Sequence, residues 1–370
     1  MTSANSDDVV VDVKYLNVIF GTKRVVRDVS FSVNRGEIIG IFGISGAGKT
    51  TTIRVLTCQI KKKYWIGNVK VTGISPAKKR NHAKILSNIG YVPQLETLNL
   101  YYDLKPMTNV ETFASTYGLD TNDAKKIAEN LFSILDIPED TWNKKLKNMS
   151  GGEKKRVSMA LGLIHQPEIL FLDEPTTGVD AYKRYSILTY LKKLNRELGT
   201  TMFIISHDME CSLVCDRAAI MRNGKLLEFG NPKDLVASLP SNGIMAMFSI
   251  EDLNENKIEI VRKYPAVKTL IRTGNEAIEV LLDDFETNIS KLVRHMIKKG
   301  IKINSMTRAT ATFRRFFQIR IQEEDEKERR EKEEKGQVDK KEKAPEEIKK
   351  QDGEKRKNKA KKGKKRGETK

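Results

Sequence analysis

Cysteine is scarce in this chain, which has three cysteines among 370 residues: Cys58, Cys211 and Cys215. An odd and sparse set argues against a disulfide framework and favours a reducing compartment. Cys211 and Cys215 lie one helical turn apart, but no histidine pair completes a zinc-binding pattern. We therefore expect both thiols to be small core residues, as free cysteines usually are.

Long apolar runs are absent as well. No run approaches the roughly 20 residues that a membrane-spanning helix needs, and the longest, Ile38 to Ile44, is interrupted by Gly40 and Gly43. The N-terminus lacks the basic and then apolar pattern of a secretory signal. These absences predict a protein that does not cross a bilayer by itself.

Acidic residues are outnumbered by basic ones. The chain has 67 Lys and Arg against 49 Asp and Glu, which gives a formal charge of +18 and a pI near 9.5. Such an excess favours an anionic neighbour, and phospholipid, nucleic acid and nucleotide all qualify. The length suffices for one large domain and a small one.

A glycine-rich loop follows the first buried strand that the sequence predicts. Glu37 to Phe42 reads as that strand, GISGAGKT (Gly43 to Thr50) as the loop, and Thr51 to Cys58 as a helix. This order is the context of a phosphate-binding loop, in which glycines let backbone N–H groups surround the phosphates. The helix start adds partial positive charge. Lys49 is then expected to reach the β- and γ-phosphates, and the hydroxyl of Thr50 to hold Mg²⁺.

A second informative stretch extends from Asn148 to Asp180. Ser150 followed by Glu153 is a capping box, which predicts a helix start. The helix should end before Pro167, and the apolar run from Ile169 to Leu172 predicts a strand buried on both faces. That strand would deliver Asp173 and Glu174 at its carboxyl end, where α/β sheets place their ligand sites. Helical periodicity gives the predicted helix one apolar face, made of Val157, Ala160, Leu161 and Ile164.

Further elements follow from the same rules of periodicity and turn chemistry. We expect two strands between Val9 and Val33 around a turn at Gly21, and further strands at Asn68 to Val71, Ile89 to Val92 and Thr201 to Ser206. The expected helices are a basic helix-like segment from Ala77 to Leu86, helical sequence from Val110 to Leu135 with a turn at 118–120, and a helix from Lys183 to Leu198 closed by Gly199.

Taken in order, these motifs resemble the nucleotide-binding subunit of an ABC (ATP-binding cassette) transporter, over about Val9 to Gly230. The matching positions are Gly43 to Thr50 for Walker A, Gln94 for the Q-loop, Met149 to Glu153 for the signature, Ile169 to Glu174 for Walker B, Gly178 to Asp180 for the D-loop, His207 for the switch histidine and Phe20 for the aromatic that stacks on adenine. Two departures in the signature are mild, because Met149 replaces the usual Leu and Glu153 replaces the common Gln around an intact Ser-Gly-Gly core.

The resemblance implies an α/β P-loop NTPase with a parallel β-sheet core, an antiparallel β subdomain and a helical subdomain. It implies ATP and Mg²⁺ as cofactors and two copies that face each other head to tail. The implied catalytic residues are Glu174, His207, Gln94 and Lys49. The implied metal ligands are Thr50, Gln94 and Asp173. Nucleotide contacts would come from Phe20, Gly43, Ile44, Ser45, Gly46, Ala47, Gly48, Lys49, Thr50, Thr51, Ser150, Gly151, Gly152 and Asp180, with Ser150 and Gly152 completing the site of the other copy.

The remainder predicts a small α+β domain. After a linker from Asn231 to Asn242, residues 268–273 and 277–282 resemble a hairpin around Gly274-Asn275. A helix closed by Gly300, a strand from Ile301 to Met306 and a last helix should follow. Phe313, Phe316 and Phe317 fall on that last helix, and we expect Phe316 and Phe317 to be core residues. The helix before Gly300 presents Ile289, Leu292, Val293, Met296 and Ile297 on one face. The arrangement is similar to the C-terminal extension of ABC ATPases in the drug- and polysaccharide-export group.

Four segments result: a disordered N-terminus at 1–8, the ATPase domain at 9–235, the α+β domain at 236–321, and a charged, basic, disordered tail at 322–370. Within the tail, Glu323/Lys327 and Asp325/Arg329 are spaced to support an exposed helix. The segment from Lys355 to Arg366 is basic, has no acid and is expected to be disordered. A solubilising role, contact with anionic lipid, and contact with RNA are the alternatives for this tail, and RNA is disfavoured because no aromatics interleave the lysines.

We therefore expect the ATPase subunit of an exporter, on the cytoplasmic face of the cell membrane, paired with separate permease subunits as a homodimer or heterodimer. The alternative is a soluble ABC ATPase acting on nucleic acid or ribosomes. Single-cassette length and the lack of heptads between Ile60 and Lys147 favour transport. Glu174 and His207 argue against a non-hydrolysing scaffold.

Overall fold

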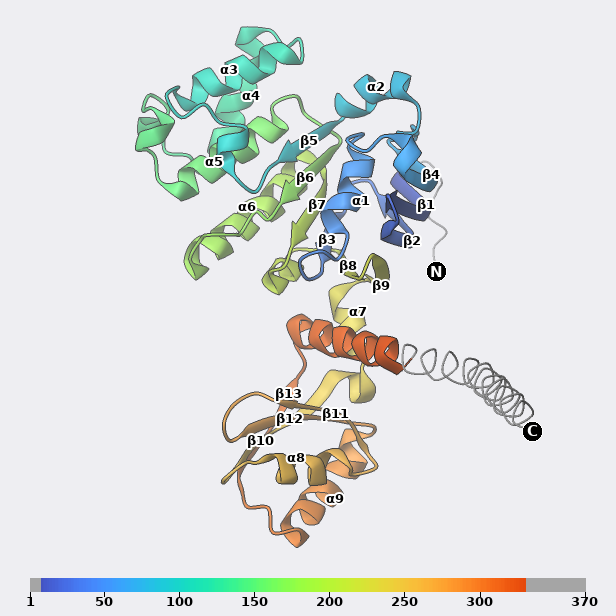
Figure 1. Cartoon of the computed structure of the whole chain (residues 1–370). Coiled ribbons are helices and arrows are strands. Elements are labelled where there is room, and N and C mark those ends of the chain that lie inside the picture. Colours follow the sequence, from blue (N-terminus) through green and yellow to red (C-terminus); the bar gives the residue numbers. More distant parts are fainter. Residues whose placement is uncertain (1–7, 331–370) are drawn as a thin grey trace, which may run out of the picture. The chain divides into compact units, whose positions relative to one another are not determined.

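The computed structural model describes residues 8–330 (Figure 1). The chain divides into two compact units, one through Phe317 and one from Gln318 onward, and each is considered by itself. Most of the expected N-terminal segment and of the charged tail lies outside the described residues. In the second unit, residues 322–330 are helical, so the predicted disorder of the tail is wrong for these residues; the spacing of acids and bases there supports the helix.

An antiparallel sheet opens the first unit. It consists of β1 (Val9–Phe20), β2 (Lys23–Asn34) and β4 (Trp65–Val71), in the order β2-β1-β4. Valines alternate along β1 and β2, and Val11 and Val13 pair with Val33 and Phe31, so one face of the sheet is apolar. The predicted strand pair around Gly21 is confirmed.

The central sheet is mostly parallel. Its order is β5-β6-β7-β3-β8-β9, and only β9 runs antiparallel to its neighbour. All residues of β3 and β7 are buried, as continuous apolar runs in a two-sided parallel sheet require. The strands are β3 (Ile38–Phe42), β5 (Ile89–Val92), β6 (Ile169–Asp173), β7 (Thr201–Ser206), β8 (Arg217–Arg222) and β9 (Lys225–Gly230). The first four confirm predicted strands, whereas β8 and β9 had not been predicted.

This topology brings four loops together. Because β5, β6, β7 and β3 are parallel neighbours, their carboxyl ends lie at the same edge of the sheet. The glycine loop follows β3, Gln94 follows β5, Glu174 follows β6 and His207 follows β7. Segments far apart in the sequence are therefore adjacent at one edge.

Helices cover the central sheet and form a separate group beside it (Figure 1). α1 (Lys49–Leu56) packs its apolar side chains into one cluster with the antiparallel sheet and the central sheet. α3 (Pro106–Thr116), α4 (Thr121–Ile134) and α5 (Gly151–Leu163) pack on one another. α6 (Ala181–Leu198) ends at Gly199, whose φ of 65° is left-handed as predicted for a C-cap. The expected turn at 118–120 separates α3 from α4.

One predicted helix is wrong in extent. The basic segment from Ala77 to Leu86 contains only α2 (His82–Leu86), preceded by a short 3-10 turn from Lys79 to Asn81. Lys78, Lys79 and Arg80 would place positive charge at the start of a longer helix, against its dipole, and no acid occupies that first turn.

The predicted linker at 231–242 is helical over most of its length. It contains α7 (Pro232–Ala237) and a 3-10 turn from Pro240 to Gly243. The side chain of Asn231 accepts a hydrogen bond from the backbone of Lys233, and Pro232 occupies the first helical position. The Asn-Pro pair is thus a helix start rather than a loop signal.

A four-stranded sheet with two helices follows α7. Its strands are β10 (Ile244–Ile250), β11 (Val267–Arg272), β12 (Ala277–Leu282) and β13 (Ile303–Thr310), in the order β11-β12-β10-β13, and its helices are α8 (Glu255–Arg262) and α9 (Phe285–Lys298). The predicted hairpin and the α+β class are confirmed, whereas β10 and α8 had not been predicted. On α9, Leu292 and Met296 are buried, but Ile297 is 62% exposed and does not belong to the predicted face.

The predicted core residues near the end of the chain are confirmed. Phe313, Phe316 and Phe317 on the helix that begins at residue 313 are buried, and the ring of Phe313 packs edge-on against Phe42 of β3 at 5.3 Å. Cys211 and Cys215 are buried too, as expected for core thiols.

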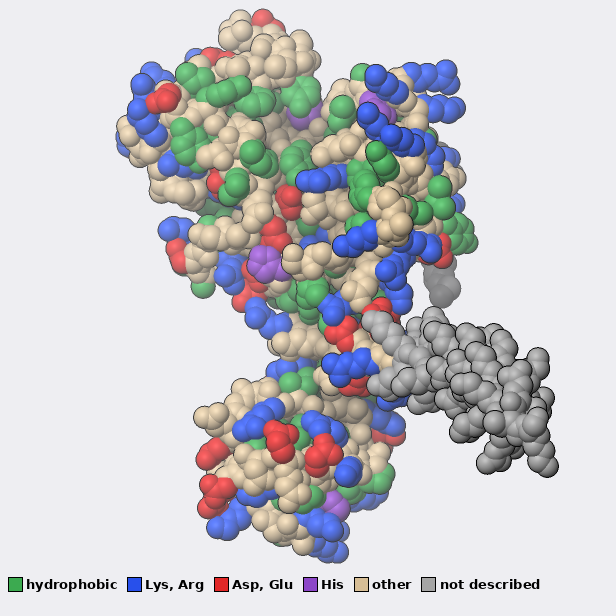
Figure 2. All heavy atoms as spheres, in the orientation of Figure 1, with side chains coloured by type: hydrophobic (Ala, Val, Ile, Leu, Met, Phe, Trp, Pro, Cys, Tyr) green, Lys and Arg blue, Asp and Glu red, His purple; other side chains and the backbone are tan. Residues whose placement is uncertain are grey.

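The surface is unevenly charged. Lys and Arg side chains gather around α2, with few acids among them (Figure 2). The chain from Ile38 to Leu95 contains no Asp or Glu at all. Within residues 8–330, no helix combines the length and the apolar character needed to cross a membrane.

Candidate functional site

The glycine loop between β3 and α1 is shaped by close backbone contacts. A Cβ at Gly43 would lie 2.4 Å from the carbonyl oxygen of Met221, and Gly48 has a φ of 100°. Any side chain at Gly43 would therefore clash, and Gly48 adopts a conformation that other residues avoid. Gly48 is also the N-cap of α1. The loop thus presents a helix N-terminus, with its free N–H groups and partial positive charge, at the edge of the sheet.

Lys49 is buried at the base of this loop. Its ammonium donates hydrogen bonds to the carbonyl oxygens of Gly43, at 2.6 Å, and Ile44, at 3.3 Å. Burial lowers the pKa of Lys49, while the negative charges of Glu174 and Asp173 oppose that shift. The cation is held beside the loop, near the edge where a phosphate would bring compensating charge.

Asp173 ends β6 and contacts a residue that the motifs did not predict. The hydroxyl of Tyr91, on the neighbouring strand β5, donates a hydrogen bond to Asp173 Oδ2 at 3.0 Å. Burial and the adjacent carboxylate raise the pKa of Tyr91, so it stays protonated and remains a donor. No sequence signal connects these two side chains; their pairing results from the parallel register of β5 and β6.

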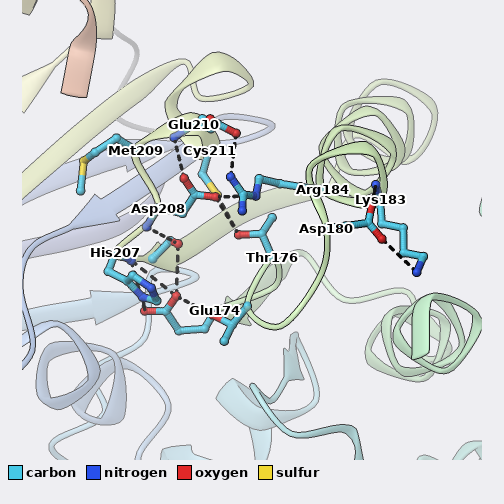
Figure 3. Close-up of polar contacts among 12 residues, drawn as sticks. Glu174, Thr176, Asp180, Lys183, Arg184, His207, Asp208, Met209, Glu210 and Cys211 are labelled. Atoms are coloured by element: carbon cyan, nitrogen blue, oxygen red, sulfur yellow. Dashed lines mark hydrogen bonds and ion pairs between the residues drawn. The ribbon is translucent and has the colours of Figure 1, made fainter. Parts of the chain in front are cut away.

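Glu174 is held by several donors (Figure 3). Its carboxylate accepts hydrogen bonds from the Ser206 hydroxyl and from the Thr177 hydroxyl, both at 3.2 Å, and from the backbone of His207, also at 3.2 Å. Nδ1 of His207 lies 2.9 Å from Glu174 Oε1. The backbone of Glu174 has a φ of 50°, a conformation that is uncommon for a residue with a side chain. The side chain is thus fixed in one orientation.

A second layer supports the end of β7. The carboxylate of Asp208 lies 3.1 Å from Arg184 Nε and accepts a hydrogen bond from Thr176 at 3.3 Å. Arg184 also pairs with Glu210 at 3.0 Å (Figure 3). These contacts join α6 to the segment after His207. They were not predicted, because the sequence positions of an acid and a base do not reveal a pairing between distant segments.

One cavity of about 580 Å³ collects most of the predicted site. It is lined by Ser45, Gly46, Ala47, Gly48, Lys49, Thr50, Thr51, Gln94, Asp173, Glu174 and His207, together with Val25, Arg54 and Ile205, which had not been predicted. Arg54 follows the loop on α1 and is exposed. Because Arg54 lies about one turn after the glycine loop on the same helix, its place beside the cavity could have been predicted from the sequence.

Seven predicted nucleotide contacts do not line this cavity: Phe20, Gly43, Ile44, Ser150, Gly151, Gly152 and Asp180. Gly43 and Ile44 instead supply the carbonyl oxygens that bind Lys49. Phe20 lies at the end of β1, 40% exposed, with its ring 5.4 Å from that of Tyr64.

The signature residues begin α5 as predicted. The Ser150 side chain accepts from the Glu153 backbone at 3.3 Å, and the Glu153 carboxylate accepts from the Ser150 backbone at 2.6 Å, which completes the capping box. Asp180 caps α6 in the same manner by accepting from the Lys183 backbone at 2.9 Å (Figure 3). That hydrogen bond lowers the pKa of Asp180. Both helix starts are exposed and lie outside the chain's own cavity.

Comparisons with known proteins agree with this geometry. The family model described as "ABC transporter" matches residues 26–177. The chain is 32% identical to the linearmycin resistance ATP-binding protein LnrL of Bacillus subtilis over 282 residues, which cover 76% of this chain and 87% of LnrL. The chain belongs to the ABC transporter family.

Other ABC relatives are similar over comparable lengths. The uncharacterised ATP-binding protein YhcH of Bacillus subtilis is 35% identical over 75% of this chain and 85% of its own length. The methionine import ATP-binding protein MetN 1 of Listeria monocytogenes is 32% identical over 73% of this chain and 80% of its own length.

Solved ABC cassettes have the same fold. The structure of cbiO1 from Clostridium perfringens, part of the ABC transporter complex cbiONQ, superposes with a TM-score of 0.58 at 28% identity, over 62% of this chain and 92% of cbiO1. The cassette MJ0796, in a dimeric state bound to ADP and Pi, superposes with a TM-score of 0.53 at 26% identity, over 60% of this chain and 98% of its own.

The ABC assignment confirms several expectations at once. The chain is an ATP-binding ABC ATPase with the α/β P-loop NTPase architecture. Its function is the ATP-driven part of transport, with membrane-spanning permease subunits as separate proteins and dimerisation as the family's mode of assembly.

Proposed function

We propose that this ABC ATPase hydrolyses MgATP with the residues that surround its cavity and uses the cycle to drive export. The observation that carries the proposal is the convergence of the glycine loop, Gln94, Asp173, Glu174 and His207 on one cavity at the carboxyl edge of the sheet. These residues stand at the carboxyl ends of four neighbouring strands, with Asp173 and Glu174 both at the end of β6, so their meeting is a property of the fold.

Phosphate binding falls to the loop backbone and Lys49. The N–H groups of residues 46–51 surround an anion at the start of α1, where the helix dipole adds favourable charge. Lys49 exchanges its contacts with Gly43 and Ile44 for phosphate oxygens. Thr51 is part of the same helix start. Phe20 is proposed as the adenine platform, because its ring is 40% exposed beyond the contact with Tyr64.

Magnesium fits the oxygen donors at this edge. Thr50, Asp173 and Gln94 line the same cavity and offer a hydroxyl, a carboxylate and an amide oxygen, the hard ligands that Mg²⁺ prefers. When bound, the ion neutralises phosphate charge that develops in the reaction. Tyr91 orients the Asp173 carboxylate through its hydrogen bond.

Glu174 is the proposed general base, or the group that positions the attacking water. The donors around its carboxylate fix its orientation. His207 lies against the same carboxylate and is 63% exposed, so its ring can turn to the γ-phosphate. The Gln94 side chain contacts the metal and the attacking water.

Two copies complete the active sites. Ser150 and Gly152 begin an exposed, capped helix, and such a helix start is an anion site. We propose that they contact the ATP held by the other copy, with Gly151 between them and Asp180 beside them. The dimeric state of the related cassette MJ0796 supports this arrangement. A homodimer and a heterodimer with a second ATPase both satisfy it.

A second cavity, of about 710 Å³, is proposed as the permease contact. It lies between α2, β5, α3 and α5 and is lined in part by Leu86, Tyr91, Phe113 and Tyr117. Leu95 and Leu98, 59% and 72% exposed, lie in the segment that leads to Asn99, which lines the same cavity. An apolar groove of this kind marks a protein–protein contact. We assign it to a cytoplasmic segment of the permease.

The position we propose is peripheral, on the cytoplasmic face of the cell membrane. Lys61, Lys62, Lys78, Lys79 and Lys84 are exposed within the acid-free stretch, beside segments that line the permease groove. A basic surface in that position suits anionic headgroups. Contact of the basic tail with anionic lipid is a separate proposal, on residues outside the described part of the chain.

We propose that the ATPase domain spans 9–235 and the appended α+β domain 236–321, with α7 at their junction. We propose export as the direction of transport. Similarity to a resistance protein, LnrL, over 76% of this chain supports it. Similarity to a methionine importer, MetN 1, at the same identity supports the opposite direction. Transport assays in inside-out vesicles with the cognate permease would decide, because an exporter accumulates substrate inside such vesicles when ATP is added outside.

The experiment that tests the catalytic assignment is Glu174→Gln in the full chain. The amide keeps the size and the acceptor oxygen but cannot take a proton, so ATP binding should persist while turnover falls at least about 100-fold, the lower end of the range for loss of general-base catalysis. Unchanged turnover would refute the assignment. The chain can also be purified from membranes by pull-down. If ribosomes or DNA copurify with it and no multi-helix membrane protein does, the result would favour the nucleic-acid alternative.

A further inference from the structure

Lys155 is a buried cation that the proposed mechanism does not use. It lies one turn into α5, and it is 1% exposed. Its ammonium donates to the carbonyl oxygen of Gln94 at 3.1 Å and to that of Pro93 at 3.4 Å, and it lies 3.3 Å from Glu96 Oε1. All three partners belong to the short segment that follows β5.

These contacts account for the whole hydrogen-bonding capacity of the side chain. An ammonium has three N–H donors and no acceptor, and three oxygens surround this one. A buried charge persists only when it is paired and hydrogen-bonded, because desolvation otherwise costs more than the charge contributes. The Lys155 side chain is therefore held in one position, and so is the backbone that it binds.

A second contact joins the same two elements. The Ser158 hydroxyl, one turn further along α5, donates to Asn99 Oδ1 at 3.0 Å. Positions 155 and 158 lie on one face of the helix. The segment from Pro93 to Asn99 is thus attached to α5 at both of its ends, and it follows α5 when that helix moves.

The two ends of this connection reach different nucleotides, if the proposed function is correct. Gln94 lines the chain's own cavity, and Ser150 and Gly152 at the start of α5 face the nucleotide of the other copy. We propose that Lys155 is a positioning residue that couples the two ATP sites of the dimer. A displacement of α5 by the partner's nucleotide moves the Gln94 backbone and changes how its side chain approaches metal and water.

The coupling works in both directions. Thermodynamic linkage requires that a nucleotide which moves Gln94 also change the affinity of the signature end for the partner's ATP by the same factor. The dimer should therefore hydrolyse ATP cooperatively, and the cooperativity should depend on the ammonium of Lys155 more than on its stem.

The test compares Lys155→Met with Lys154→Met in the full chain. Methionine keeps the length of the stem and removes the donors, and Lys154 is the partly exposed neighbour on the same helix. For Lys155→Met we expect a Hill coefficient close to 1. We also expect kcat to fall roughly 10-fold, because Gln94 is no longer held in position. The affinity for the first ATP that binds to the dimer does not depend on the coupling, so in a Glu174→Gln background it should change less than about 2-fold. Lys154→Met should retain the cooperativity and kcat of the unmodified chain, and Lys155→Arg should restore part of both.

Hydrogen exchange provides a measurement that needs no Lys155 variant. In the Glu174→Gln chain, addition of MgATP should change the protection of residues 93–99 and of residues 151–163 at the same nucleotide concentration. Independent responses of the two segments would overturn the proposal, as would a folded Lys155→Met protein with unchanged Hill coefficient. A Glu174→Gln chain that fails to bind ATP would instead contradict the proposed function, so the two failures are distinguishable.

Discussion

The hydroxyl of Tyr91 lies 3.0 Å from a carboxylate oxygen of Asp173 and donates a hydrogen bond to it. Tyr91 also lines the apolar groove between α2 and α3, while Asp173 lines the nucleotide cavity. One side chain thus borders both the surface assigned to the permease and the carboxylate assigned to Mg²⁺.

Tyr91→Phe should raise the Mg²⁺ concentration that this ATPase requires. The ring is retained and the hydrogen bond to the metal-binding carboxylate is lost, and loss of such outer contacts typically costs 10- to 100-fold in metal affinity. Because Tyr91 is 37% exposed, we expect an effect at the lower end of this range. The Mg²⁺ concentration for half-maximal ATP hydrolysis should rise about 10-fold. Tyr101→Phe, at an exposed site, is the control. Equal Mg²⁺ titrations for the two variants would contradict the prediction.

Ser150→Ala and Ser150→Asp should separate the structural and the catalytic roles of the signature start. Alanine removes the cap of α5 and should cost about 1 kcal/mol of stability. Aspartate keeps a capping oxygen but places a negative charge where the partner's phosphate is expected. The aspartate variant should therefore melt near the temperature of the unmodified chain and lose ATP hydrolysis. An active Ser150→Asp protein would count against a phosphate contact at this position.

Cys211 should make stability fall at alkaline pH. Burial raises the pKa of this thiol to about 11 from its ordinary value of 9.0, so the folded state retains a proton that the unfolded state releases. The contribution is fully present below pH 9 and is lost as the pH rises to about 11, at about 1.4 kcal/mol for each unit of pKa difference. Thermal melting between these pH values, compared with Cys211→Ala, measures the slope. An equal slope in both proteins would exclude the thiol as its source.

Phe316→Ala should be strongly destabilising. The side chain is fully buried, and truncating a buried phenylalanine typically costs about 3–5 kcal/mol because a cavity remains. Met306→Ala, at a side chain that is 46% exposed, should change stability by no more than about 0.5 kcal/mol. Denaturation of both full-length variants provides the comparison. Similar small losses for both would place Phe316 outside the tightly packed core.

Local signals explain what the sequence could predict. The capping box joins Ser150 and Glu153, which are three residues apart, and the glycine loop from Gly43 to Thr50 is likewise contiguous. The strand runs at 38–42, 169–172 and 201–206 are continuous and mostly apolar, so their burial could be predicted from the sequence. Most residues of the nucleotide cavity were predicted before its geometry was known, the loop residues from their contiguous pattern and others, such as Gln94 and His207, from the resemblance to ABC ATPases.

Contacts between distant segments explain what the sequence could not predict. Tyr91 and Asp173, and likewise Lys155 and Gln94, meet only through the register of strands and the packing of α5. Ile297 belonged to the apolar periodicity of α9, yet the helix buries a narrower face than periodicity suggested. Tertiary packing decides such cases, and local pattern does not.

The position of β3 in the central sheet has a consequence for the order in which the protein can be made. β3 lies between β7 and β8, and Ile38 pairs with Met202 while Ile39 pairs with Arg217. During synthesis, the strand that carries the glycine loop emerges early and has no sheet partner until residues beyond 200 have followed. Such long-range pairing slows folding and leaves apolar strands exposed in the meantime. By contrast, the sheet of β10 to β13 is assembled from one contiguous segment and can fold as soon as that segment leaves the ribosome.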